Sequence, residues 1–370
     1  MVFFWLLKML TFPLTFLFLL MAGLFSTVIR CIRAKLAPCD APGFADEKAR
    51  ETMTPVSILE VNVTLPSKII FVDETLMVQF DPTEFAQIPA VTLGEGTVGP
   101  LFKTVLNCGS TVTVRRVRNA ALKKTELEGW IRFFGGIRDP YLCPVLFSFW
   151  YGDEAFLGYF YMCLGSLEEL LHGKEGIQFT PLNWGIRLQI SLCAAMAVAN
   201  LQSRASHGGK PLVCGVVKSS NVLIRTDFTA CLTSYETPYL SSPAVLIRRN
   251  TGRIAPEVLM KSQGSNHQPN FTHKSDVYSF GVFLLEIVTG KKPVFSNDDR
   301  DEIRLVDYVK NNIRMNGGIV LLHTIYDRKM GEATDSMRKM IEIALLCIRS
   351  DPSERPTMES IVTMIQQLQY

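Results

Sequence analysis

Three glycines are the first residues in this chain whose spacing indicates chemistry. Gly94, Gly96 and Gly99 follow the order Gly-x-Gly-x-x-Gly. Glycines lack side chains, so backbone amides can come close to phosphate oxygens, as in a nucleotide-binding loop. The same pattern is also typical of a tight turn held by packing, and the sequence alone leaves both interpretations open.

Lys218 and Asn221 are two further polar residues with an informative spacing. They lie in residues 214–221, which read Cys-Gly-Val-Val-Lys-Ser-Ser-Asn. They match the fifth and eighth positions of the protein-kinase catalytic loop, His-Arg-Asp-Leu-Lys-x-x-Asn. Such a short match is weak evidence by itself.

Four downstream segments make the match specific, because they follow in the order and spacing of a kinase C-lobe. They are Ala-Pro-Glu at 255–257, Lys-Ser-Asp-Val-Tyr-Ser-Phe-Gly at 274–281, Glu-Ile-Val-Thr-Gly-Lys-Lys-Pro at 286–293 and Asp-Pro-Ser-Glu-Arg-Pro at 351–356. Their sequences resemble those of plant receptor-like kinases. Residues 80–94 resemble the start of the kinase domain in the leucine-rich-repeat branch, and the resemblance runs from about Ser67 to the C-terminus.

This resemblance implies an α+β, bilobal protein-kinase-like fold in residues 67–370. We expect a small β-rich N-lobe at about 67–161 and a large helical C-lobe at about 162–370. Three residues are expected to support the C-lobe. Glu257 and Arg355 should form a buried ion pair, and Asp276 should anchor the catalytic-loop backbone.

The parts that the family uses for phosphoryl transfer are changed. Val216 stands at the catalytic aspartate position and cannot orient a hydroxyl. Ser234 stands at the metal-binding aspartate position, where its hydroxyl cannot replace a carboxylate ligand. Arg115 replaces the β3 lysine, and Trp130 stands where its helix glutamate is expected, so we expect that ion pair to be absent. We therefore predict a pseudokinase without catalytic residues or a metal site.

Activation-loop control is also expected to be lost, because Gly215 replaces the arginine that pairs with a phosphorylated loop. The residues left for a degenerate nucleotide site are Gly94, Gly96, Gly99, Arg115, Lys218 and Asn221. No cofactor is certain, and if ATP binds we expect it to bind without metal.

The resemblance favours a scaffold or allosteric partner of an active receptor-like kinase. One alternative is a switch that binds ATP without catalysis. Another is an atypical or weakly active serine/threonine kinase that uses Arg115, Asn221 and Glu236 in rearranged roles. A gene product without a selected role is the last alternative.

Residues 10–29 are almost wholly apolar and long enough for a helix to cross a membrane. Lys8 precedes them, whereas Arg30, Arg33 and Lys35 follow, so the positive-inside rule places the C-terminal part in the cytosol. We expect a short segment at 1–9, a single transmembrane helix at 10–29 and a linker at 30–66. We expect the membrane to be the plasma membrane, and we expect no ectodomain. A cleaved signal peptide is the alternative.

Charge and cysteine content limit the kinds of partner that we expect. A net charge of +3 is too small to predict nucleic-acid binding. Nine cysteines without paired spacing fit reduced thiols in the cytosol. The expected partners are therefore a membrane and an active receptor-like kinase or another membrane signalling protein, with no nucleic acid.

Apolar spacing predicts the main elements. We expect strands at 101–106 and 111–117, joined by a turn at 107–110, and an N-lobe helix at 127–134. Further helices are expected at 184–201, at 276–289 with Gly290 as the stop, at 337–348 and after Thr357 as N-cap. Trp130, Phe133 and Phe134 on the N-lobe helix are interpreted as core residues, with a partner surface as the alternative.

Overall fold

The computed structural model describes residues 68–71, 88–117, 123–151, 154–173, 182–206, 209–263, 270–296, 300–317 and 321–369. The predicted segments 1–9, 10–29 and 30–66 lie outside these described residues. Within them, one helix, α5 (Trp184–Gln202), is long and apolar enough to cross a membrane. Most of its side chains are buried among other elements, which is typical of a core helix.

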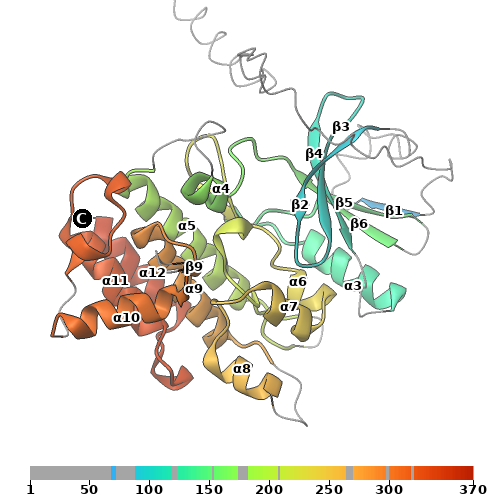
Figure 1. Cartoon of the computed structure of the whole chain (residues 1–370). Coiled ribbons are helices and arrows are strands. Elements are labelled where there is room, and N and C mark those ends of the chain that lie inside the picture. Colours follow the sequence, from blue (N-terminus) through green and yellow to red (C-terminus); the bar gives the residue numbers. More distant parts are fainter. Residues whose placement is uncertain are drawn as a thin grey trace, which may run out of the picture. The chain divides into compact units, whose positions relative to one another are not determined.

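A six-stranded antiparallel sheet forms the first part of the fold, in the order β1-β5-β6-β4-β3-β2 (Figure 1). The strands are β1 (Lys68–Phe71), β2 (Ala90–Glu95), β3 (Pro100–Val105), β4 (Thr111–Val117), β5 (Phe147–Tyr151) and β6 (Glu154–Phe160). Helix α3 (Lys124–Gly135) packs on this sheet, since Leu127, Ile131 and Phe134 share a hydrophobic core with Leu157 of β6. This small unit positions Arg115 on a central strand.

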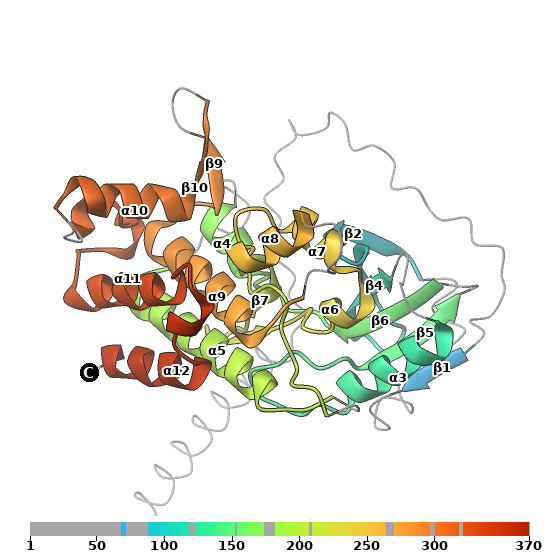
Figure 2. The same cartoon turned by 90° about the horizontal axis from the view of Figure 1, so that it is seen from below.

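Helices dominate the second part of the fold. They are α4 (Leu167–His172), α5, α6 (Thr237–Leu240), α7 (Pro243–Arg249), α8 (Pro256–Gln263), α9 (His273–Thr289), α10 (Leu305–Met315), α11 (Asp335–Cys347) and α12 (Met358–Gln366). Helix α9 is buried along nearly its whole length, packs beside α11, and also contacts α5, which packs against α12 (Figure 2). Thr272 caps the N-terminus of α9, and Gly290 ends α9 with a left-handed φ of 65°.

Short elements complete the helical part. Two-stranded sheets pair β7 (Val222–Ile224) with β8 (Ala230–Leu232), and β9 (Val294–Ser296) with β10 (Glu302–Arg304). Single 3₁₀ turns are η2 (Ser219–Asn221), η3 (Leu322–Thr324), η4 (Arg328–Met330), η5 (Pro352–Glu354) and η6 (Gln367–Gln369). Turn η2 is the end of the catalytic-loop segment, residues 214–221, and the Asn221 carbonyl accepts from the Thr233 amide at 2.8 Å. This places the chain that leads from β8 to α6 beside the segment.

The predicted α+β fold is confirmed, and each predicted helix lies within a few residues of its expected bounds. The predicted hairpin is β3–β4, with its turn at 106–110. Thr357 caps α12 by accepting a hydrogen bond from the Ser360 amide, and Met358, Ile361 and Ile365 are buried. Apolar spacing predicted α12 because this helix buries one apolar face, whereas α5 and α9 are buried around most of their surface.

Candidate functional site

The glycine-rich segment folds down onto the catalytic-loop segment. The Gly96 amide donates to the Gly99 carbonyl at 2.9 Å, and a Cβ at Gly96 would lie only 3.0 Å from that oxygen. Val98 at the tip is 3% exposed and belongs to the main hydrophobic core. Lys218 Nζ donates to Thr97 Oγ1 at 3.3 Å. The tip is therefore closed, with its own side chain packed inward.

Arg115 on β4 lies in a buried polar network. Its Nη1 is 3.6 Å from Glu236 Oε1, and Tyr159 of β6 donates its hydroxyl to the same oxygen at 2.7 Å. Arg115 is 7% exposed and Glu236 is 1% exposed. Burial, followed by the charge of Glu236, raises the pKa of Tyr159, so its hydroxyl stays a hydrogen-bond donor. These three residues are called the Arg115 network below.

The Arg115 network differs from what the sequence predicts. Trp130 on α3 supplies no carboxylate, as expected, but Arg115 still has one from the chain just before α6. Sequence reasoning treated Glu236 only as a residue for rearranged catalysis. The network is incompletely satisfied, because Arg115 Nε and Glu236 Oε2 are buried without a hydrogen-bond partner. The ion pair joins the other two atoms, Arg115 Nη1 and Glu236 Oε1, so each side chain keeps one buried polar atom unsatisfied.

The two aspartate positions carry no negative charge. Val216 is 4% exposed, and Ser234 is buried with a left-handed φ of 63° and an Oγ without a hydrogen-bond partner. Asn221 lies in η2, where its backbone carbonyl accepts from the Thr233 amide at 2.8 Å. Among the residues that the structure describes, no group of three or more His, Cys, Asp or Glu side chains could hold a metal ion.

Asp276 holds the catalytic-loop backbone. Its two carboxylate oxygens accept from the amides of Cys214 and Gly215, both at 2.8 Å. Complete burial raises the pKa of Asp276 to about 7, while these hydrogen bonds act in the opposite direction. Gly215 has a φ of 81°, and a Cβ there would lie 2.4 Å from Pro238 Cγ. The arginine position of the family loop therefore has no room for a side chain.

Glu257 and Arg355 are brought together as a bidentate ion pair. Arg355 Nη1 and Nη2 donate to the two Glu257 oxygens at 2.7 and 2.8 Å. The Arg355 guanidinium also donates to the carbonyls of Lys274, Arg349 and Ser350. A buried arginine with this many partners fixes the start of α8 against the loop before α12.

A further buried carboxylate, Glu286 on α9, was not predicted from the sequence. Arg253 Nη2 donates to it at 3.0 Å, Ser219 Oγ at 2.7 Å, and His172 Nε2 lies 2.9 Å away. Burial acts to raise the pKa of Glu286, but His172, Arg253 and Ser219 outweigh it, so the pKa is lowered. The signal was available, since an acidic residue inside an apolar helix indicates a buried partner.

Aromatic side chains connect α3 with α6. The ring centroids of Trp130 and Tyr239 are 4.5 Å apart, and those of Phe134 and Tyr239 are 5.2 Å apart. The Tyr239 hydroxyl accepts from the Val213 amide at 2.8 Å. Phe134 is 1% exposed, whereas Trp130 is only half-buried. Phe134 is therefore a core residue, as predicted, and Trp130 packs against the core while remaining partly exposed.

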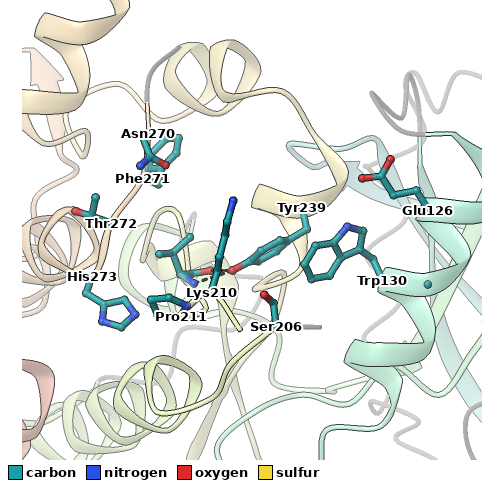
Figure 3. Close-up of a pocket in the computed structure, with 12 residues that line it drawn as sticks. Glu126, Trp130, Ser206, Lys210, Pro211, Tyr239, Asn270, Phe271, Thr272 and His273 are labelled. Atoms are coloured by element: carbon teal, nitrogen blue, oxygen red, sulfur yellow. Dashed lines mark hydrogen bonds between the residues drawn. The ribbon is translucent and has the colours of Figure 1, made fainter. Parts of the chain in front are cut away.

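Trp130 and Tyr239 also line a pocket of about 760 Å³ (Figure 3). Its other walls include Ser206, Lys210, Pro211 and Val213, and Phe271 from the segment leading into α9. The two rings face each other between α3 and α6 in Figure 3, while Lys210 and Glu126 are exposed. This pocket is separate from the Arg115 network and has no cluster of catalytic groups.

With this geometry established, comparisons with known proteins identify the fold family. The model of the protein tyrosine and serine/threonine kinase family matches residues 90–365. Probable inactive receptor kinase RLK902 from Arabidopsis thaliana is 32% identical, over 85% of this chain and 47% of that protein. The chain therefore belongs to the protein tyrosine and serine/threonine kinase family, and its relatives place it among the plant receptor-like kinases.

Two solved structures have the same fold. The maize SIRK1 kinase domain bound to AMP-PNP superposes with a TM-score of 0.70 at 29% identity, covering 82% of this chain and all of that chain. The pseudokinase domain of BIR2, an immune regulator of the RLK/Pelle family, gives a TM-score of 0.60 at 26% identity, with 83% and 91% coverage. The chain spans about half the length of the curated relatives it matches.

Proposed function

We propose that this chain is a non-catalytic receptor-like kinase that acts as a scaffold or allosteric partner of an active receptor-like kinase at the cytoplasmic face of a membrane. The Arg115 network is the observation that carries the proposal. The cation at the phosphate-gripping position is buried and bound to Glu236. The nearby positions Val216 and Ser234 offer no carboxylate for a base or a metal.

The expected loss of catalytic rate is large enough to support this proposal. Removing one well-placed electrostatic group commonly raises a reaction barrier by about 3 to 4 kcal/mol. Here the base, the metal ligand and the lysine are all replaced, and although such effects do not add, no described side chain takes over these roles. Glu236 is committed to Arg115 and Tyr159, which argues against the atypical-kinase alternative.

For nucleotide binding we propose that ATP, if it binds, does so without a divalent metal. Asn221 is left as a single amide ligand, and Mg²⁺ usually requires carboxylates in addition to phosphates. The buried tip of the glycine-rich segment must also move before phosphates can lie beneath it, because Val98 fills that side of the loop. ATP sensing is therefore the weaker alternative.

The relatives support a signalling role at a membrane. RLK902 is named a probable inactive receptor kinase, and BIR2 is described as a pseudokinase and immune regulator. The predicted membrane helix at 10–29 would hold the domain beside other receptor kinases. On this proposal the structural ion pair Glu257–Arg355 and the Asp276 anchor preserve a binding surface rather than a catalytic centre.

The test uses the full chain purified in detergent. Phosphotransfer from radiolabelled ATP to a generic protein substrate is measured with Mg²⁺ or Mn²⁺, with an active receptor-like kinase domain as positive control. We expect no turnover and no metal-dependent thermal shift. The same active kinase is then mixed with this chain, and we expect a complex and a changed rate of autophosphorylation of that kinase. Metal-dependent turnover that disappears in the Asn221→Ala variant would overturn the proposal.

A further inference from the structure

The pocket beside Trp130 has no part in the Arg115 network, and its lining suits a partner (Figure 3). Its volume of about 760 Å³ is in the range of cavities that bind ligands. Aromatic and aliphatic side chains form much of its wall, namely Trp130, Tyr239, Phe271, Pro211 and Val213. Trp130 and Tyr239 are only half-buried, so part of their apolar surface is open to a further group.

Contacts within the chain hold the walls of this pocket in place. The Trp130 ring lies 4.5 Å from the Tyr239 ring and stacks on Phe134, with ring centroids 5.7 Å apart and planes 20° apart. On another wall, His273 Nε2 lies 2.8 Å from the Leu212 carbonyl oxygen, which ties the start of α9 to the segment before the catalytic loop. A partner therefore meets a preformed surface and orders few side chains when it binds.

Gly129 lines the same pocket from the middle of α3. Glycine is among the least favourable residues in a helix interior, so its presence there calls for a packing reason. The described residues supply none, because beyond the helix's own backbone nothing lies within 4 Å of a Cβ added at Gly129. The bare backbone instead lets an outside group approach α3 more closely than a side chain would allow.

Glu126 and Lys210 give the pocket charges of both signs. Both side chains are exposed, and neither forms an ion pair within the part of the chain that the structure describes. In Figure 3 the rings of Tyr239 and Trp130 lie between Lys210 and Glu126. An apolar wall between two unpaired charges of opposite sign is complementary to a segment that carries a basic, an apolar and an acidic side chain.

We propose that this pocket binds a peptide segment of a partner protein, in which an apolar side chain of about the size of leucine lies between a basic and an acidic residue. The apolar side chain packs on Trp130 and Tyr239 and against the backbone at Gly129. The basic residue pairs with Glu126, and the acidic residue pairs with Lys210. This inference rests on the proposed function, because it assigns the surface by which the scaffold recognises its partner.

Two features favour a protein segment as the occupant. The charged side chains are exposed around apolar walls, as in the polar rim and apolar centre of a protein interface. Tryptophan and tyrosine are also the side chains that most often carry the binding energy of such interfaces. A small ligand would instead require polar groups buried within the pocket.

The first experiment measures peptide binding to the full chain in lipid nanodiscs, which keep detergent out of the apolar pocket. The probes are three peptides in which one, two or three alanines separate a central leucine from a lysine on one side and an aspartate on the other. We expect one spacing to bind saturably in calorimetry and to change the tryptophan fluorescence of the chain. The chain has four tryptophans, so the Trp130→Phe variant should lack this change.

Replacing the central leucine by serine should weaken peptide binding at least tenfold. No saturable binding at any spacing, or equal binding of the serine peptide, would overturn the proposal.

A leucine at position 129 tests whether the open space on α3 is the binding surface. Gly129→Leu should fill the pocket and weaken peptide binding at least tenfold, while its thermal unfolding midpoint does not fall. Thr125→Leu is the matched control, because Thr125 is exposed on the same helix and does not line the pocket. Equal losses in the two variants would show that the peptide binds elsewhere and would overturn the proposal.

Charge reversal tests the pairing with Lys210. The wild-type chain should prefer the peptide with one lysine and one aspartate over a peptide with two lysines. Lys210→Glu should reverse this preference, because both ends of the pocket are then acidic. An unchanged preference would refute the charge pairing and with it the proposed occupant. A dimer of the chain that Gly129→Leu abolishes would assign the pocket to a second copy and also overturn it.

The outcomes separate this inference from the proposed function. A chain that lacks phosphotransfer and binds an active kinase equally well with and without Gly129→Leu would keep the proposed function and refute the peptide pocket. A chain that binds the peptide through Gly129 and also transfers phosphate with metal would refute the proposed function, while the pocket would remain.

Discussion

The catalytic-loop segment should reject any side chain at position 215, including the arginine of the active family. Gly215 has a φ of 81°, and a left-handed backbone costs a residue with a Cβ about 1 to 2 kcal/mol. A Cβ would also lie 2.4 Å from Pro238 Cγ, and such overpacking costs about 1 to 3 kcal/mol more. Gly215→Ala is therefore expected to lower the free energy of unfolding by roughly 2 to 5 kcal/mol.

A matched variant separates the two causes. Gly209 has a φ of 69°, but no atom lies within 4 Å of an added Cβ, so Gly209→Ala should lose only the backbone part. Urea unfolding followed by circular dichroism gives both values. Adding Pro238→Ala to Gly215→Ala should recover the steric part. Equal losses for the Gly209 and Gly215 variants would refute the reasoning, since the contact with Pro238 would then carry no cost.

Three further predictions concern buried or partly buried charges. Glu257→Gln should lower the free energy of unfolding by about 3 to 5 kcal/mol, because Arg355 would remain buried without its ion-pair partner. A loss below about 1 kcal/mol in urea unfolding would contradict this expectation. Glu236→Gln should also lower the free energy of unfolding, because Arg115 would remain buried without its carboxylate. In a double-mutant cycle, adding Arg115→Met should recover at least half of the lost free energy of unfolding. Burial, followed by nearby positive charges, lowers the pKa of Lys218 to about 8. Lys218 should therefore be about half neutral at pH 8, whereas an ordinary lysine is less than about 1% neutral, and its acetylation rate should rise with a midpoint near pH 8. A midpoint above pH 10 would contradict this reasoning.

The helical part of the fold was predictable because its signals are local or periodic. Gly290 follows the apolar stripe of α9 and takes the left-handed conformation that ends a helix. Thr357 precedes α12 and caps it as expected. Neither signal depends on knowing which other element packs against the helix. Strand order could not be read from local patterns, because the pairing of β1 with β5 joins segments far apart in the sequence.

The Glu257–Arg355 ion pair could be predicted from the family resemblance, whereas the partner of Arg115 could not. Val216 and Ser234 could be assigned by counting along the family motifs. The partner of Arg115 could not, because Glu236 reaches it only when the chain before α6 turns inward, with Ser234 at a φ of 63°. A backbone conformation that few residues adopt is not encoded in hydrophobic spacing. The network of Glu286 could not be predicted for a different reason. Its apolar surroundings in the sequence indicate a buried carboxylate, but its three partners come from separate segments of the chain.

The buried charges suggest that the substitutions in this domain are physically linked. An arginine on β4 without a carboxylate would be a buried, unpaired cation, and breaking such a pair costs about 3 to 5 kcal/mol. Glu236 removes that cost only because Ser234 turns the segment inward and Gly215 leaves room for Pro238. Gly215→Arg alone would therefore destabilise the fold, because its Cβ would lie 2.4 Å from Pro238 Cγ. The charge network around Arg115 is thus rearranged through several positions at once, and not only at a single aspartate.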